Sequence, residues 1–131
     1  MLKVILDTNI LVSSLLASGP PAVIADLVAE NKIIPFYTDL ILKEYWDVLL
    51  RDKFGFSLLQ VTHLIDDIVR AGFAVKNYSP SCFKLSDEDD RVFYDASVHS
   101  NAYLITGNVK HYPQKPFIVT PAQFLRIYQK V

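Results

Sequence analysis

Short runs of β-branched and other apolar residues alternate with longer segments of helical periodicity along the whole chain. We expect strands at 4–6, 33–37, 73–75, 102–106 and 117–119, and helices at 9–17, 21–30, 39–52, 57–71, 88–101 and 121–129. Continuous apolar runs such as Val4-Ile5-Leu6 are typical of strands that are buried on both faces of a sheet. The alternation therefore predicts an α/β fold with a mostly parallel central sheet.

Capping signals precede several of these helices. Residues that cap a helix N-terminus, some with a returning polar side chain three positions later, stand at Thr38, Ser57 with Gln60, Ser86 with Asp89, and Thr120 with Gln123. The start of a helix is therefore predicted at each of these places.

Length and composition bound the class of protein. The chain has 131 residues, and we expect a single domain over 1–131. Its 51% hydrophobic and 21% charged residues exclude intrinsic disorder. Cys82 is the only cysteine, which excludes an internal disulfide and suits a reducing compartment. No apolar stretch approaches the ~20 residues of a membrane span, so we expect a soluble, cytoplasmic protein without membrane contact.

Polar residues follow two of the predicted strands. Asp7 comes directly after the first strand, and Thr106, Gly107 and Asn108 end and follow the strand at 102–106. Functional groups in parallel sheets lie beyond the carboxyl ends of the strands. Two simpler interpretations stay open: Asp7 caps the next helix, and Gly107-Asn108 forms an ordinary turn.

Two predicted helices carry acids on faces that turn inward. Glu44 shares a stripe with Ile41, Tyr45 and Val48, although it also suits an exposed edge or a pair with Lys43 or Arg51. In the run 87–90, the first three acids are typical of a helix N-terminus. Asp90 differs because it shares a row with residues expected to face the sheet, Phe93, Ser97 and Ser100. Asp95 lies roughly 140° around the same helix, so helical geometry alone does not bring it to Asp90.

These acids and amides are expected to converge at one edge of the sheet. Carboxylates that are buried together raise one another's pKa, and a hard divalent cation removes that conflict. The sequence lacks a His/Cys cluster for zinc, a Ser-His-Asp order and a phosphate-binding loop. We therefore expect an oxygen-ligated site for a hard divalent cation such as Mg²⁺.

The ordered set of motifs resembles the PIN-domain family across essentially the whole chain. The motifs are Leu6-Asp7-Thr8-Asn9-Ile10-Leu11, Glu44, Asp87-Glu88-Asp89-Asp90 and Leu104-Ile105-Thr106-Gly107-Asn108. The branch that it resembles most contains VapC-related toxins of toxin–antitoxin systems. The resemblance implies a three-layer α/β/α sandwich and a Mg²⁺- or Mn²⁺-dependent endoribonuclease that cuts single-stranded RNA. It also implies a homodimer and a cognate antitoxin.

Site residues carry over position by position from the resemblance. Asp7, Glu44 and Asp90 are expected to be catalytic and to bind metal, and Asp95 matches a second acid of its helix that also binds metal. Asn108 stands at a catalytic position where many members have a fourth acid, and Thr106 matches the hydroxyl position of the same motif. An amide at 108 brings no charge, which weakens any second metal position.

The basic side chains near these motifs are candidates for RNA contacts. No acid follows Asp95, whereas residues 96–131 contain four lysines and arginines. Lys110 and His111 are expected to hold phosphate, Tyr112 to stack on a base, and Arg91 and Thr106 to contact the nucleic acid. Scattered basic residues are also ordinary on soluble domains.

Two rival functions remain open from the sequence. A haloacid-dehalogenase-type phosphotransferase also begins with an Asp after strand one, but it needs a second acid two residues later, where this chain has Asn9. The other rival is a catalytically weak or inactive PIN scaffold that binds RNA or a protein partner, and Asn108 favours it.

Overall fold

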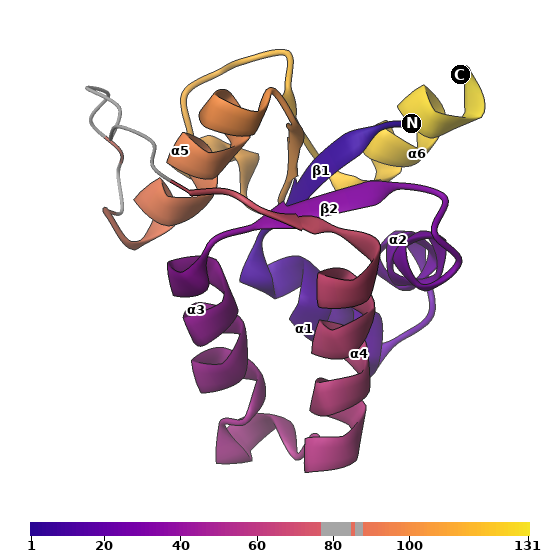
Figure 1. Ribbon diagram of the computed structural model, residues 1–131, viewed down its shortest axis with the longest axis vertical. Helices are drawn as coiled ribbons and strands as arrows, with labels where there is room; N and C mark the ends of the chain where they lie inside the picture. The colour runs from indigo at the N-terminus through magenta and orange to yellow at the C-terminus, as the bar shows by residue number, and fades with distance from the viewer. Residues whose placement is uncertain (77–84, 86–87) are drawn as a thin grey trace.

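The computed structural model of the chain describes residues 1–76, 85 and 88–131 (Figure 1). The only cysteine, Cys82, lies outside the described residues. So do Asp87 and the Ser86 of the predicted capping box with Asp89.

The centre of the fold is a five-stranded sheet in which every neighbouring pair is parallel. Its spatial order is β3-β2-β1-β4-β5. The strands are β1 (Lys3–Leu6), β2 (Ile34–Tyr37), β3 (Phe73–Ala74), β4 (Tyr103–Ile105) and β5 (Ile118–Val119). All five predicted strands are confirmed, and β1 lies at the centre with Val4, Ile5 and Leu6 buried, as its continuous apolar run predicts.

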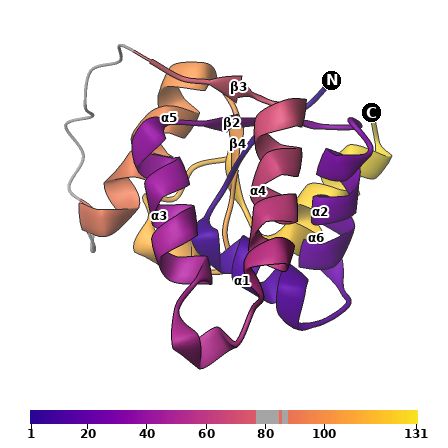
Figure 2. The same ribbon diagram turned by 60° about the horizontal axis from the view of Figure 1, so that its bottom comes forward.

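Helices cover both faces of this sheet. They are α1 (Thr8–Leu16), α2 (Pro20–Ala29), α3 (Asp39–Leu49), α4 (Leu58–Ala71), α5 (Arg91–Ser100) and α6 (Pro121–Gln129). The helices α1 to α4 gather on one side and α5 lies on the other, while α6 contacts α2 (Figures 1 and 2). The expected α/β/α sandwich is confirmed.

Three capping signals act as the sequence predicts. Thr38 accepts a hydrogen bond from the Ile41 amide at the start of α3. The capping boxes at the starts of α4 and α6 are complete in both directions, from Ser57 with Gln60 and from Thr120 with Gln123. These side chains satisfy amides that a helix leaves without partners in its first turn.

Two helix boundaries differ from the prediction by more than one residue. The helix α3 ends at Leu49, three residues early, and the 3₁₀ helix η1 (Asp52–Phe54) follows. Gly55 then takes a left-handed conformation with φ 67°, and the ring of Phe54 stacks on Phe56 at a centroid distance of 5.4 Å. The helix α5 starts at Arg91, because its predicted first turn is the 3₁₀ helix η2 (Glu88–Asp90).

The described part of the chain contains no single helix that is long and apolar enough to span a membrane. The helices α1 and α2 together pass that test by length and composition, but they are bent by 101° at the break between them.

Candidate metal-binding site at the carboxyl edge of the sheet

The site begins where β1 and β4 end side by side. Leu6 pairs with Ile105, and the amide of Asp7 donates to the Ile105 carbonyl at 3.0 Å. The strand-to-loop segment that starts at Thr106 therefore lies beside Asp7, at the carboxyl edge where parallel sheets place functional groups.

The Asp7 carboxylate faces the sheet edge rather than the helix that follows it. Asp7 stands at the N-cap position of α1, but its side chain makes no capping hydrogen bond. Its Oδ2 accepts from the Thr106 hydroxyl at 2.8 Å and from the Tyr112 hydroxyl at 3.2 Å, and only 5% of the residue is exposed. The capping interpretation is therefore wrong, and two neutral donors hold this buried carboxylate in place.

Thr106 orients its neighbours from inside the protein. It is fully buried, and its Oγ1 both donates to Asp7 and accepts from the Asn108 amide at 3.0 Å. In the structure the Thr106 hydroxyl donates to Asp7, whereas the sequence predicted that Thr106 contacts nucleic acid. Asn108 is half-buried at the start of the 3₁₀ helix η3 (Val109–His111).

Glu44 is half-buried, and Thr8 is its hydrogen-bond partner. Thr8 is the residue after Asp7, and its hydroxyl donates to Glu44 Oε2. The predicted alternative of a pair with Lys43 is wrong, because Lys43 contacts Asp47 at 2.7 Å. Burial raises the pKa of Glu44, the hydrogen bond from Thr8 opposes the rise, and the charge of Asp7 adds to it.

Tyr112 lies near enough to the three predicted acids for their charges to affect its pKa. Burial raises the pKa of Tyr112 far above its ordinary value, and the charges of Asp7, Asp90 and Glu44 raise it further. Asp7 follows β1, Asp90 ends η2 and Glu44 lies in α3, yet the charges of all three raise the pKa of this one phenol. Tyr112 is 6% exposed, so it supports Asp7 from within and is not the exposed base-stacking ring that the sequence predicted.

Asp90 sits at the N-cap position of α5, with a largely buried side chain that is 17% exposed. Its Oδ2 lies 3.5 Å from Nδ1 of His111. The sequence assigned His111 to phosphate, and the structure places this imidazole, which is half-exposed, against the carboxylate of Asp90.

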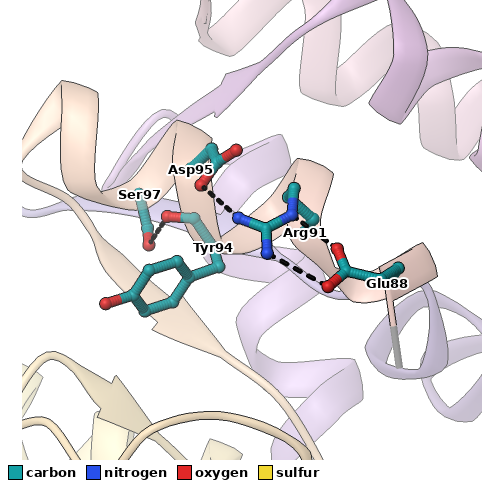
Figure 3. A network of polar contacts seen from close by, with 5 residues as sticks. All are labelled: Glu88, Arg91, Tyr94, Asp95 and Ser97. Atoms are coloured by element: carbon teal, nitrogen blue, oxygen red, sulfur yellow. Dashed lines mark hydrogen bonds and ion pairs between the residues drawn. The ribbon is translucent and has the colours of Figure 1, made fainter. Parts of the chain in front are cut away.

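Arg91 and Asp95 form a separate network on α5 (Figure 3). Nε of Arg91 donates to Glu88 at 2.6 Å, and its Nη1 lies 3.8 Å from a carboxylate oxygen of Asp95. The side chain of Arg91 is only 23% exposed, so its charge is already shared between two acids. The expected phosphate contact of Arg91 and the expected metal contact of Asp95 both compete with this ion pair.

The carboxylates of the site have the right chemistry for a hard cation, but they do not lie close enough together to form a metal-binding group. Asp7, Glu44 and Asp90 offer only carboxylate oxygens, the ligands that Mg²⁺ and Mn²⁺ prefer. Among residues 1–76, 85 and 88–131, no three His, Cys, Asp or Glu side chains lie close enough together to hold a metal.

Sequence reasoning missed the two hydroxyl partners Thr8 and Tyr112 in these roles. Thr8 directly follows Asp7, so its position beside a candidate acid could have indicated a role in the site. Its hydroxyl bonds to Glu44 of α3, whereas Asp7 bonds to residues that follow β4. Tyr112 lies 105 residues from Asp7, and no local pattern predicts that contact.

Replacing Tyr112 by Phe tests this geometry. We expect a loss of about 1 kcal/mol of stability near neutral pH, because Asp7 loses one donor while Thr106 remains. The folded protein keeps the Tyr112 proton above about pH 10, where the unfolded chain releases it, so wild-type stability falls there by up to ~1.4 kcal/mol per pH unit. Urea unfolding should thus show that the difference between the two proteins closes by about pH 11. A constant difference would contradict the burial of this hydroxyl against Asp7.

Comparison with known proteins agrees with this architecture. The model of the PIN domain family matches residues 3–110. An uncharacterized protein of Methanocaldococcus jannaschii, MJ1680, is 32% identical over 111 residues, which cover 82% of this chain and 71% of the relative. No solved structure matches the chain significantly. The match over most of the chain shows that this protein belongs to the PIN-domain family, whose members are typically nucleases.

Proposed function

We propose that this protein is a metal-dependent endoribonuclease that cuts single-stranded RNA in the cytoplasm. The observation that carries the proposal is the buried Asp7 carboxylate at the carboxyl edge of the sheet, with Glu44 held near it by Thr8, the residue that follows Asp7. Structural acids on this small domain have exposed positions and basic partners available, as Asp47 has with Lys43. A carboxylate such as Asp7, which is buried at a strand end with only neutral donors as hydrogen-bond partners, is instead a candidate functional group.

Asp7, Glu44 and Asp90 are the residues that would hold the ion. When bound, a divalent cation lowers the pKa of water and stabilises charge on a phosphoryl oxygen. The chain's own hydroxyls fix the carboxylates: Thr106 and Tyr112 orient Asp7, and Thr8 orients Glu44. Because Asn108 is neutral, we propose one metal position rather than two. Asp95 forms an ion pair with Arg91, so we propose that it supports the site through Arg91 and does not bind the ion itself.

The test is cleavage of a labelled single-stranded RNA by wild-type protein with Mg²⁺, with Mn²⁺ and with EDTA. We expect cuts only with a divalent ion, and products that carry 5′-phosphate and 3′-hydroxyl ends. Crystals soaked in Mn²⁺ should show one anomalous peak between Asp7 and Asp90. RNA binding without cleavage under both metals would overturn the nuclease and support a binding scaffold.

The binding scaffold is the second candidate because two observations favour it. Asn108 replaces a charged ligand with a neutral one, and the described residues hold no preassembled metal-binding group. The phosphotransferase rival has no such support. It predicts a trappable acyl-phosphate on Asp7, and the nuclease forms none.

A toxin role with a cognate antitoxin is a further part of the proposal. An inserted Arg or Lys of the partner would pair with the acids around Tyr112. A neutralising partner recovered by pull-down would support this, and its absence together with a lack of growth inhibition on expression would contradict it. Light scattering tests the proposed homodimer.

The acidic cluster also predicts a pH dependence of stability. The raised pKa of Glu44 means that ionising this side chain costs more in the folded state than in the unfolded state. Metal-free protein should therefore lose stability as pH rises from about 4.5 through the folded pKa. Glu44→Gln removes this loss and keeps an acceptor for Thr8, so we expect a thermal midpoint higher by about 2–4 °C near neutral pH. An unchanged or lower midpoint for the variant would contradict an energetic cost of burying the ionised Glu44 side chain beside Asp7.

A further inference from the structure

A cavity of about 690 Å³ lies outside the acidic cluster, between the segment from η3 to β5 and α6. Its lining comes entirely from the acid-free end of the chain, residues 109–130, which run from orange to yellow in Figure 1. The volume lies in the range of cavities that enclose one small-molecule-sized group.

All four lysines and arginines of the segment 96–131 line this cavity, namely Lys110, Lys115, Arg126 and Lys130, and no acid does. No ion pair with an acid joins Lys110, Arg126 or Lys130 within the described residues. The charges of Lys110, Arg126 and Lys130 around one hollow repel one another, so a bound anion stabilises the arrangement.

The walls between these cations are apolar. Val109, Ile118, Val119 and Ile127 contribute aliphatic surface, and Pro113 and Pro116 add two rigid rings. A site for inorganic phosphate alone needs no such walls. Apolar walls beside a basic rim match the two parts of a nucleotide, since a base packs on apolar surface while its phosphate pairs with Lys or Arg.

The cavity and the acidic cluster share a wall. Tyr112 lines the cavity, and its hydroxyl donates to Asp7. Lys110 lines the cavity next to His111, whose imidazole contacts Asp90. The ring of Tyr112 and the segment that holds Lys110 and His111 therefore place the cavity next to the acidic cluster.

We propose that this cavity is a nucleotide subsite that holds one base and its phosphate of a single-stranded RNA, beside the bond to be cut. The inference rests on the proposed nuclease function and adds to it the place where the substrate RNA is bound. It assigns Arg126 and Lys130 to binding the flanking phosphate and gives them no part in the acidic cluster.

The experiment measures binding of a fluorescein-labelled oligouridylate of about twelve nucleotides by anisotropy, in EDTA so that nothing is cut. The test variant is Arg126→Gln with Lys130→Gln. The control is Lys43→Gln with Lys53→Gln, which removes the same charge from α3 and η1, far from α6 in Figures 1 and 2. Thermal midpoints of both variants establish that each is folded.

We expect the test variant to bind about 10-fold more weakly, while the control stays within about twofold of wild type. Between roughly 50 and 200 mM salt, the slope of log K against log salt should be smaller by about 1.4 in the test variant, or ~0.7 for each lost phosphate contact. Equal losses in both variants, or none in either, would overturn the subsite.

Competing ligands identify the occupant. Free uridine monophosphate should displace the labelled strand only weakly, and oligoaspartate should not displace it. Displacement by the mononucleotide at the affinity of the oligomer, or preferential binding of oligoaspartate, would overturn the proposal in favour of a free nucleotide or an acidic peptide.

Failure of the subsite and failure of the nuclease are distinguishable. If the test variant cuts RNA with an unchanged KM, the subsite is wrong and the nuclease stands. If wild-type protein cuts nothing but its binding depends on Arg126 and Lys130, the nuclease is wrong and the binding cavity stands.

Discussion

Asp90→Asn is expected to lower metal-dependent RNA cleavage by about 10³-fold, more than the ~10–100-fold typical of residues that only support a metal ligand. The substitution preserves the shape of the side chain at the start of α5 but removes its charge. Because Asp90, Asp7 and Glu44 all act on Tyr112, loss of one charge weakens attraction for a cation at that point. Single-turnover cleavage with saturating Mg²⁺ measures the effect.

The matched control is Asp66→Asn, on the exposed surface of α4. It makes the same chemical change away from the cluster, and its cleavage rate should stay within about twofold of wild type. Both variants should keep thermal midpoints within about 4 °C of wild type, because neither fills nor empties the core. Equal activity in the two variants would remove Asp90 from the proposed mechanism.

Gly72→Ala is expected to cost about 3 kcal/mol or more in the free energy of unfolding. A Cβ at this position would lie 1.9 Å from the Pro35 carbonyl oxygen and 2.9 Å from that of Ile68. Both atoms belong to the backbone, so β2 or the end of α4 must move to relieve the clash. The cause is close approach, since the backbone angle of Gly72, φ −120°, is open to any residue.

Gly107→Ala is the control for this effect. A Cβ at Gly107 would meet no atom within 4 Å, so the substitution should change stability by less than about 1 kcal/mol. Urea unfolding of the two variants compares the costs directly. A similar midpoint for both would show that β2 and the end of α4 separate without cost.

The elements of the fold were predictable because their signals are local. An apolar run such as Val4-Ile5-Leu6 and a pair such as Ser57 with Gln60 act over a few residues, and the structure contains both the strand and the complete capping box. The predicted end of α3 was wrong because a turn begins there. The helix α3 stops at Leu49 so that the chain can turn through Gly55 and stack Phe54 on Phe56, which helical periodicity does not register.

The sequence pointed to the candidate residues of the site but not to their contacts. Position at a strand end singled out Asp7, and position on an inward stripe singled out Glu44 and Asp90. The hydrogen-bond and ion-pair partners of these acids could not be predicted from the sequence. Asp7 bonds to hydroxyls 99 and 105 residues away, and Arg91, expected at the substrate, is held by Glu88 and Asp95.

The sequence by itself therefore determined the alternating α/β elements, their main caps and the acids that stand at the carboxyl edge. Only the tertiary structure decided that Tyr112 lies between the acidic cluster and a basic cavity, and that His111 meets Asp90. The physical reason is how far apart along the chain the interacting residues lie. Periodicity and capping depend on neighbours within a few turns of chain, whereas these contacts form only when β1 and β4 pair and bring the residues after Asn108 beside Asp7.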